Sequence, residues 1–243
     1  MIASNGITGI LFDLDGTLRH SRPSFNQVFF NIASQLGLPL TEDNHKRSQR
    51  WLHYYWAQSP EMLADREKYA DQEDKFRVNH ARLNLVAYGY SSEQAADFAP
   101  RVYQYVSAEY QPQGYVSPDV FPTLELIQEM GLPMGILSNR REDCNQELDD
   151  LGLLGYFDFV IVAGEVNSWK PDPQIFRHSI ARLGTLPGQT AYVGDNYYAD
   201  VVGARNARLT PVLLDPDGVF PDADCVVITA MGELCAWLGD ECI

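Results

Sequence analysis

Basic residues are scarce in this chain of 243 residues: 18 lysines and arginines stand against 33 aspartates and glutamates, a formal net charge of -15 at pH 7. A negative field of this size repels polyanions, so the composition argues against binding to nucleic acid or to anionic membranes. A small anionic substrate is still compatible with the sequence, provided that a local site overcomes this field.

Long apolar runs are also absent, since none approaches the roughly 18 residues needed to cross a bilayer. The amino-terminal stretch, MIASNGITGILF, lacks the basic segment of a secretory signal peptide. The four cysteines form no CxxC pair and are expected to be reduced thiols; they are Cys144, Cys225, Cys235 and Cys242. We therefore expect a cytoplasmic protein.

Short apolar runs predict the strands of a parallel sheet. The runs lack strict alternation between apolar and polar residues, which is typical of strands covered on both faces. Helical patterns separate several of them, and this alternation indicates an α/β fold with right-handed crossovers. The expected strands are residues 7–12, 132–137, 157–163, 190–194, 210–214 and 225–228, and the expected helices among them are residues 120–130, 142–151 and 173–183.

The stretch from about residue 20 to 118 shows no convincing strand and predicts a separate helical module beside the strand ends. We expect a sheet domain of residues 1–19 and 115–243 and an inserted helical domain of residues 20–114. The expected helices of the insert are residues 23–37, 45–58, 67–89 and 91–110.

Two aspartates stand two positions apart in FDLDGTL, at the end of the first predicted strand. Residues i and i+2 of a strand face the same side, so Asp13 and Asp15 are expected to project together where open α/β folds bind ligands. Neighbouring carboxylates repel unless a cation joins them or one holds a proton. Gly16 and Thr17 allow a sharp turn and offer backbone amides. For an isolated pair of this kind, an Asx-turn that closes the strand is an equally good interpretation.

Two further segments place polar groups near strand ends. Ser138 and Asn139 follow the second predicted strand, although a serine there is also typical of a helix cap. In WKPDP, Pro171 restricts Lys170 to an extended conformation that can reach an anion, and the alternative is a solvated loop lysine. Asp172 is expected to cap the helix that follows.

GDNYYAD follows the predicted strand of residues 190–194 and opens a helix. Asp195 is expected at the strand end and Asp200 about one turn into the helix, facing the same cleft. Acidic residues in a first turn also favour the helix dipole, which is the alternative. Four aspartates, one lysine and one hydroxyl at the strand ends of one sheet are better explained together by a shared site.

The set FDLDGTL, LSN, KPDP and GDNYYAD, in this order and spacing, resembles the four motifs of the haloacid dehalogenase-like hydrolase superfamily. The resemblance runs from about residue 7 to 215, and the helical insert looks like the C1-type cap of that family. It implies a Rossmann-like core and Mg²⁺-dependent transfer of a phosphoryl group. The expected substrate is a small phosphorylated metabolite.

The resemblance also implies a role for each motif residue. Asp13 matches the nucleophile that forms an aspartyl-phosphate, and Asp15 matches the general acid and base. Ser138 matches the hydroxyl that holds the phosphoryl group, and Lys170 matches the lysine that balances charge on the nucleophile and on the phosphoryl oxygens. The expected substrate-binding set adds three neighbours of these residues: Gly16, Thr17 and Asn139.

The metal site implied by the resemblance includes Asp195, with Asp200 supporting the metal or orienting the lysine. Mg²⁺ prefers a few carboxylates together with water and substrate oxygens, at about 2.0–2.1 Å. A metal and a lysine together offset the repulsion between a carboxylate nucleophile and a phosphate. The expected metal residues are Asp13, Asp15, Asp195 and Asp200.

Asp15 favours a phosphatase over a dehalogenase, because an alkoxide leaving group needs a proton whereas a halide does not. Two alternatives stay open: a phosphomutase of the β-phosphoglucomutase type, and a non-catalytic binding protein of the same fold. Arg208 departs from the family pattern, since relatives often have glycine there. Candidates for reading the leaving group are Arg19, His20, Arg22, Lys46, Arg47, Arg50 and residues 51–56.

Overall fold

The computed structural model describes residues 3, 5–38 and 41–239 of the chain. It divides into two compact units, one from Met1–His20 and Tyr115–Ile243 and the other from Ser21–Gly114. The assignment of these units as a core domain and a cap domain stays a prediction. Cys144, Cys225 and Cys235 form no disulfide within the described ranges, whereas Cys242 lies outside them.

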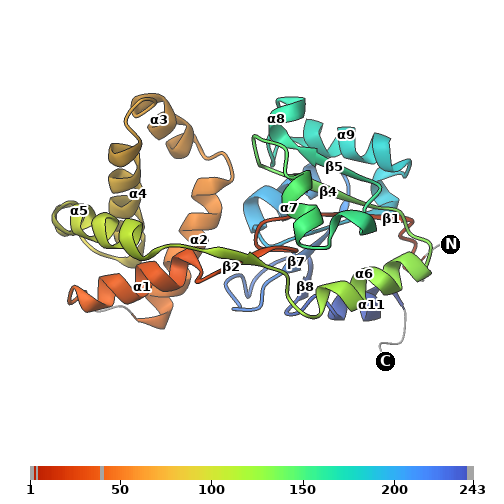
Figure 1. Cartoon of the computed structure of the whole chain (residues 1–243), viewed down its shortest axis with the longest axis horizontal. Helices are drawn as coiled ribbons and strands as arrows, with labels where there is room; N and C mark the ends of the chain where they lie inside the picture. Colours follow the sequence, from red (N-terminus) through yellow and green to blue (C-terminus); the bar gives the residue numbers. More distant parts are fainter. Residues whose placement is uncertain (1–2, 4, 39–40, 240–243) are drawn as a thin grey trace. The chain divides into compact units, whose positions relative to one another are not determined.

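A parallel sheet forms the centre of the first unit (Figure 1). Within the described residues it has six strands in the order β5-β4-β1-β6-β7-β8, and every neighbouring pair is parallel. The predicted α/β fold with a parallel sheet is therefore confirmed. The strands are β1 (Gly9–Phe12), β4 (Met134–Ser138), β5 (Phe159–Val162), β6 (Thr190–Gly194), β7 (Thr210–Leu214) and β8 (Val226–Ile228).

Helices cover both faces of this sheet, because its strands are apolar on both sides. Ile10 and Phe12 of β1 pack into one core cluster, and Leu11, between them, packs into the other. The first cluster includes residues of α6 (Val120–Glu129), α7 (Asn145–Asp150) and α11 (Glu233–Leu238), and α6 and α11 lie side by side (Figure 1). The second includes residues of α9 (Pro173–Leu183) and α10 (Val202–Asn206). The shorter elements are η1 (Leu154–Tyr156), α8 (Ala163–Val166), η2 (Pro187–Gln189) and η3 (Tyr197–Val201).

Helix α9 begins and ends where the sequence predicts. The Asp172 side chain accepts a hydrogen bond from the backbone N–H of Gln174 at 2.8 Å, and Pro173 occupies the first turn. The helix ends at Gly184, whose φ of 75° is the left-handed conformation that glycine adopts without strain. The Asp172 cap fixes where the helix begins, directly after the loop that contains Lys170.

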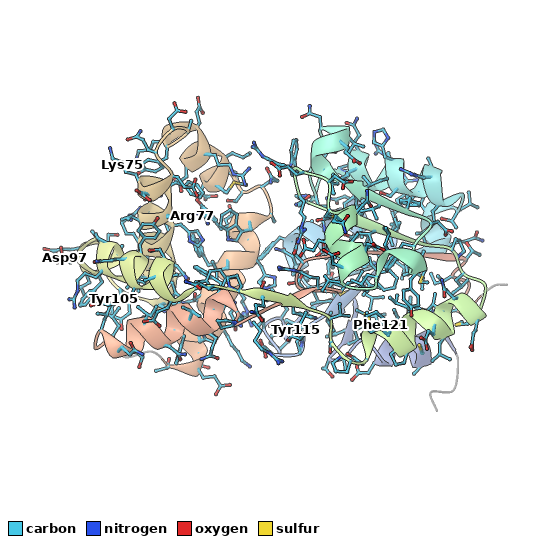
Figure 2. The ribbon with its side chains drawn as sticks, in the orientation of Figure 1. Lys75, Arg77, Asp97, Tyr105, Tyr115 and Phe121 are labelled. Atoms are coloured by element: carbon cyan, nitrogen blue, oxygen red, sulfur yellow. The ribbon has the colours of Figure 1, made fainter. Side chains whose placement is uncertain are left out.

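The second unit consists of helices with their own apolar core. On α5, Ala95, Ala99, Val102 and Val106 repeat at helical spacing and are buried, whereas Tyr105 is 47% exposed (Figure 2). The predicted single segment of residues 67–89 is wrong, because it forms parts of two helices. The helices are α1 (Phe25–Gln35), α2 (Glu42–Trp56), α3 (Pro60–Lys68), α4 (Glu73–Tyr88) and α5 (Ser92–Glu109).

Two short strands correct the prediction that the stretch of residues 20–118 has none. β2 (His20–Arg22) pairs with β3 (Gln113–Tyr115), and the rings of His20 and Tyr115 lie 5.5 Å apart between centroids. Each strand is too short to show a period of two, and its partner is distant in the sequence.

Among the described helices, none combines the length and apolar character that a bilayer crossing requires.

Candidate active site

Three aspartates meet at the carboxyl ends of neighbouring strands. Asp13 follows β1, Asp195 follows the adjacent β6, and Asp200 lies in η3, a π-helical turn. One carboxylate oxygen from each residue lies within 4.8 Å of the other two. This spacing suits a metal ion that is held by carboxylate oxygens.

Two glycines make room for these carboxylates because they have no side chain. A Cβ atom on Gly16 would lie 2.3 Å from Oδ2 of Asp195, and the φ of Gly16 is 95°. A Cβ atom on Gly194 would lie 2.3 Å from Oδ2 of Asp200. Any side chain at either position would displace a carboxylate, so the glycines beside the acidic residues in DLDG and GDN are part of the site.

The electrostatics of this cluster favour a bound cation. Burial raises the pKa of Asp13 to about 7; Lys170 opposes this shift and the Asp200 carboxylate adds to it. Burial, and then the charges of Asp13 and Asp200, hold the pKa of Asp195 well above its ordinary value. Because a divalent cation would relieve both the repulsion and the lost solvation, the residues present fit a metal ion.

Lys170 is buried against the cluster and is 2% exposed. Its ammonium donates to Oδ1 of Asp13 at 2.6 Å, to Oδ1 of Asp200 at 2.7 Å and to the hydroxyl of Tyr192 at 2.8 Å. Burial alone lowers the pKa of Lys170, but the charges of Asp13 and Asp200 outweigh it and hold the pKa well above its ordinary value. The ammonium therefore stays charged, and the alternative of a solvated loop lysine is wrong.

Asn139 and Ser138 lie beside this lysine. The Asn139 side chain donates to the carbonyl of Lys170 at 3.0 Å and accepts from its backbone N–H at 2.7 Å, so it fixes the lysine loop. Ser138 is buried at the end of β4, and its Oγ accepts from the N–H of Arg140 at 3.3 Å. Thr17 is also buried, and within the described residues its hydroxyl has no hydrogen-bond partner.

Asp15 lies outside the carboxylate cluster. Its two oxygens accept from Nε and Nη2 of Arg140, each at 2.7 Å. Arg140 also pairs with Glu147, whose Oε1 accepts from Nε of Arg19 at 2.9 Å. Asp15 is not among the three aspartates whose oxygens lie together, and its predicted metal role stays a prediction.

A sequence model of the haloacid dehalogenase-like hydrolases matches residues 7–208, a span that contains the four motifs and the insert. The chain belongs to this family. The hydrolase is 30% identical to the ribulose-1,5-bisphosphate 5-phosphatase of Halopiger xanaduensis over 86% of this chain and 85% of that protein. It is 25% identical to the glyceraldehyde 3-phosphate phosphatase of Methanothermobacter thermautotrophicus over 90% of this chain and 91% of that protein.

A solved structure supports the fold of this hydrolase over its whole length. The phosphatase of the same superfamily from Thermococcus onnurineus aligns with a TM-score of 0.58 and 27% identity. The alignment covers 98% of this chain and 100% of that one. The aligned span therefore includes both the sheet that carries the acidic cluster and the helical insert.

Sequence reasoning missed three residues of the hydrolase site. Arg140 binds Asp15, Glu147 binds Arg140, and Tyr192 accepts from Lys170. Arg140 directly follows the LSN motif, and Tyr192 is a polar residue inside a buried apolar run, so each carried a weak signal. Arg19, expected to read the leaving group, is paired with Glu147 and with Asp15.

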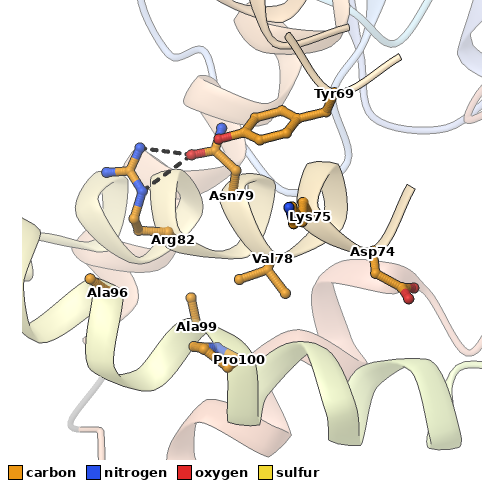
Figure 3. A pocket seen from close by; sticks show the side chains of 9 residues that line it. All are labelled: Tyr69, Asp74, Lys75, Val78, Asn79, Arg82, Ala96, Ala99 and Pro100. Atoms are coloured by element: carbon orange, nitrogen blue, oxygen red, sulfur yellow. Dashed lines mark hydrogen bonds between the residues drawn. The ribbon is translucent and has the colours of Figure 1, made fainter. Parts of the chain in front are cut away.

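An open hollow of about 440 Å³ lies between α4 and α5 of the second unit (Figure 3). Its lining includes Lys75, which donates to Gln72 at 2.7 Å, and Arg82, which donates twice to Oδ1 of Asn79 at 2.9 and 3.2 Å. These cations are hydrogen-bonded along their own helix, and the hollow contains none of the motif residues. The candidate active site therefore lies at the strand ends of the first unit.

Proposed function

We propose that this hydrolase is a Mg²⁺-dependent phosphatase that cleaves small phosphate monoesters through an aspartyl-phosphate on Asp13. The observation that carries the proposal is the buried ammonium of Lys170, held between Asp13 and Asp200 inside a triad of carboxylates. The names of the relatives, which are phosphatases of small phosphorylated metabolites, support the same reaction and substrate class.

Asp13, Asp195 and Asp200 would hold the Mg²⁺ ion, which supplies positive charge that offsets the repulsion between a carboxylate and a phosphate. Asp13 uses Oδ1 for its hydrogen bond to Lys170. Its Oδ2 is therefore the oxygen that we assign to attack on phosphorus. Lys170 lowers the negative charge on Asp13 as the dianionic phosphate approaches.

Asp15 completes the reaction as a general acid and base. It protonates the leaving alkoxide in the first step and takes a proton from the attacking water in the second, which requires one of its oxygens to separate from Arg140. The side chain of Asp15 is 42% exposed, so solvent and a leaving group can reach it. Ser138 would bind a phosphoryl oxygen. The backbone N–H groups of Gly16 and Thr17 donate to the carbonyls of Arg19 and Leu14, at 2.8 and 3.3 Å, so they hold the turn rather than the phosphate.

A substitution of the nucleophile tests the proposal. Asp13→Asn should abolish Mg²⁺-dependent release of phosphate from a panel of sugar phosphates, phosphoglycolate and p-nitrophenyl phosphate. Asp224→Asn is the matched control, because it makes the same change at an exposed residue whose partner is Arg205. Wild type and control should lose activity in EDTA. Turnover retained by Asp13→Asn would refute the nucleophile, and an absence of free phosphate with every substrate would refute the phosphatase.

A further inference from the structure

One buried hydroxyl connects three of the motif segments. Tyr192 lies in β6, is completely buried, and donates its phenolic hydrogen to the carbonyl of Leu137 at 3.1 Å. The same oxygen accepts from the ammonium of Lys170 at 2.8 Å. Leu137 directly precedes Ser138, so the hydroxyl joins the ends of β4 and β6 to the lysine loop.

The hydroxyl has one orientation that satisfies both contacts. Burial holds the pKa of Tyr192 well above its ordinary value, so the phenol keeps its proton. That proton points to Leu137, and the lone pairs of the oxygen are left for Lys170. The ring is fixed by an edge-on contact with Phe176, at 5.0 Å between centroids.

The ammonium of Lys170 has three hydrogens and three acceptors. Asp13 and Asp200 take two of them, and the third goes to Tyr192. Because Lys170 is 2% exposed, water cannot easily replace a lost acceptor. Without the hydroxyl, the ammonium would keep one unpaired hydrogen or turn away from the two carboxylates.

We infer that Tyr192 is a positioning residue: its hydroxyl fixes the ammonium of Lys170 between Asp13 and Asp200. Lys170 then acts on the nucleophile through its charge, and it makes no hydrogen bond to the phosphoryl group while its three hydrogens are engaged. The catalytic part of this inference rests on the proposed phosphatase function, whereas the positioning of the ammonium does not.

Tyr192→Phe tests the inference because it removes the hydroxyl and keeps the ring. With p-nitrophenyl phosphate and Mg²⁺, we expect kcat to fall about tenfold or more, the effect of losing one hydrogen bond to a charged group, with little change in KM. Tyr156→Phe is the matched control, since it removes a surface hydroxyl that bonds to Glu125 at 3.3 Å. Thermal unfolding of both variants measures the structural cost, and an unchanged kcat in Tyr192→Phe would overturn the catalytic role.

A second measurement follows the ammonium directly, without substrate or metal. In ¹⁵N-lysine-labelled protein, the side-chain hydrogens of Lys170 should exchange with water about tenfold faster in Tyr192→Phe than in wild type or Tyr156→Phe. Equal exchange rates would overturn the positioning, even if kcat fell. If the wild type releases no phosphate from any monoester, the proposed function fails, and the exchange rates still decide whether Tyr192 holds the lysine.

Discussion

Acid should destabilise the helical unit through His80, whose ring is buried among aromatic side chains. The imidazole is 4% exposed and lies 5.1–5.5 Å between centroids from Trp51, Tyr55 and Trp56. Its Nε2 atom has no hydrogen-bond partner within the described residues. Burial, with a smaller effect from Arg77, lowers the pKa of His80 from 6.5 to about 3.

The sign of the pH dependence follows from this shift. Below pH 6.5 the unfolded chain protonates His80 whereas the folded chain does not, so protons favour unfolding. The stability that the neutral ring provides is complete above pH 6.5 and is lost progressively as the pH falls toward about 3. Between pH 7.5 and pH 5, the loss from this group is about 2 kcal/mol, because each pH unit below 6.5 costs about 1.4 kcal/mol.

Urea unfolding of wild type and His80→Leu at several pH values checks this magnitude. Trp51 and Trp56 contact His80, so tryptophan fluorescence reports on this unit, while Trp169 and Trp237 report on the other. The leucine variant should lose about 2 kcal/mol less stability than wild type between pH 7.5 and pH 5. His178→Gln, which removes an exposed imidazole from α9, should behave as wild type. Equal pH dependence in wild type and His80→Leu would refute the reasoning.

The remaining predictions concern the metal site and one strained residue. Mg²⁺ at 100 times its Kd should stabilise the wild type by about 2.7 kcal/mol in thermal unfolding, and Asp195→Asn should remove most of this gain; an equal gain in the variant would contradict the assigned ligands. Arg208→Gly should raise the free energy of unfolding by about 0.5–1 kcal/mol, because Arg208 is exposed at a φ of 66°, where a side chain is strained. Urea unfolding measures this change. Asn167→Gly, at a φ of 47°, should gain less stability, because asparagine tolerates this region. A loss of stability in Arg208→Gly would count against the argument.

The local site explains how a chain with a net charge of -15 can act on an anion. Lys170 is the buried cation of the cluster, and a bound metal would add two further positive charges beside Asp13. Charges in a site with little water act more strongly than exposed charges, which solvent and salt screen. Association with a phosphate therefore depends on these few groups more than on the total charge.

Local patterns in the sequence determined the sheet, the helices that cover it, and the strand ends at which the motif residues lie. Apolar runs, glycine stops and the Asp172 cap act over a few residues, so they can be read without the fold. Gly16 and Gly194 are also visible in the sequence. Only the positions of the Asp195 and Asp200 carboxylates show why no side chain fits at these two positions.

Only the tertiary structure decided how the charged groups share partners. Asp15 binds Arg140, 125 residues away, and so leaves the carboxylate cluster that its neighbour Asp13 joins. Lys170 meets Tyr192 and Asp13 inside the protein, where burial makes each unmet hydrogen bond costly. These partners are far apart in the sequence and meet only because the fold brings them together. The order of residues along one strand or helix does not specify such distances.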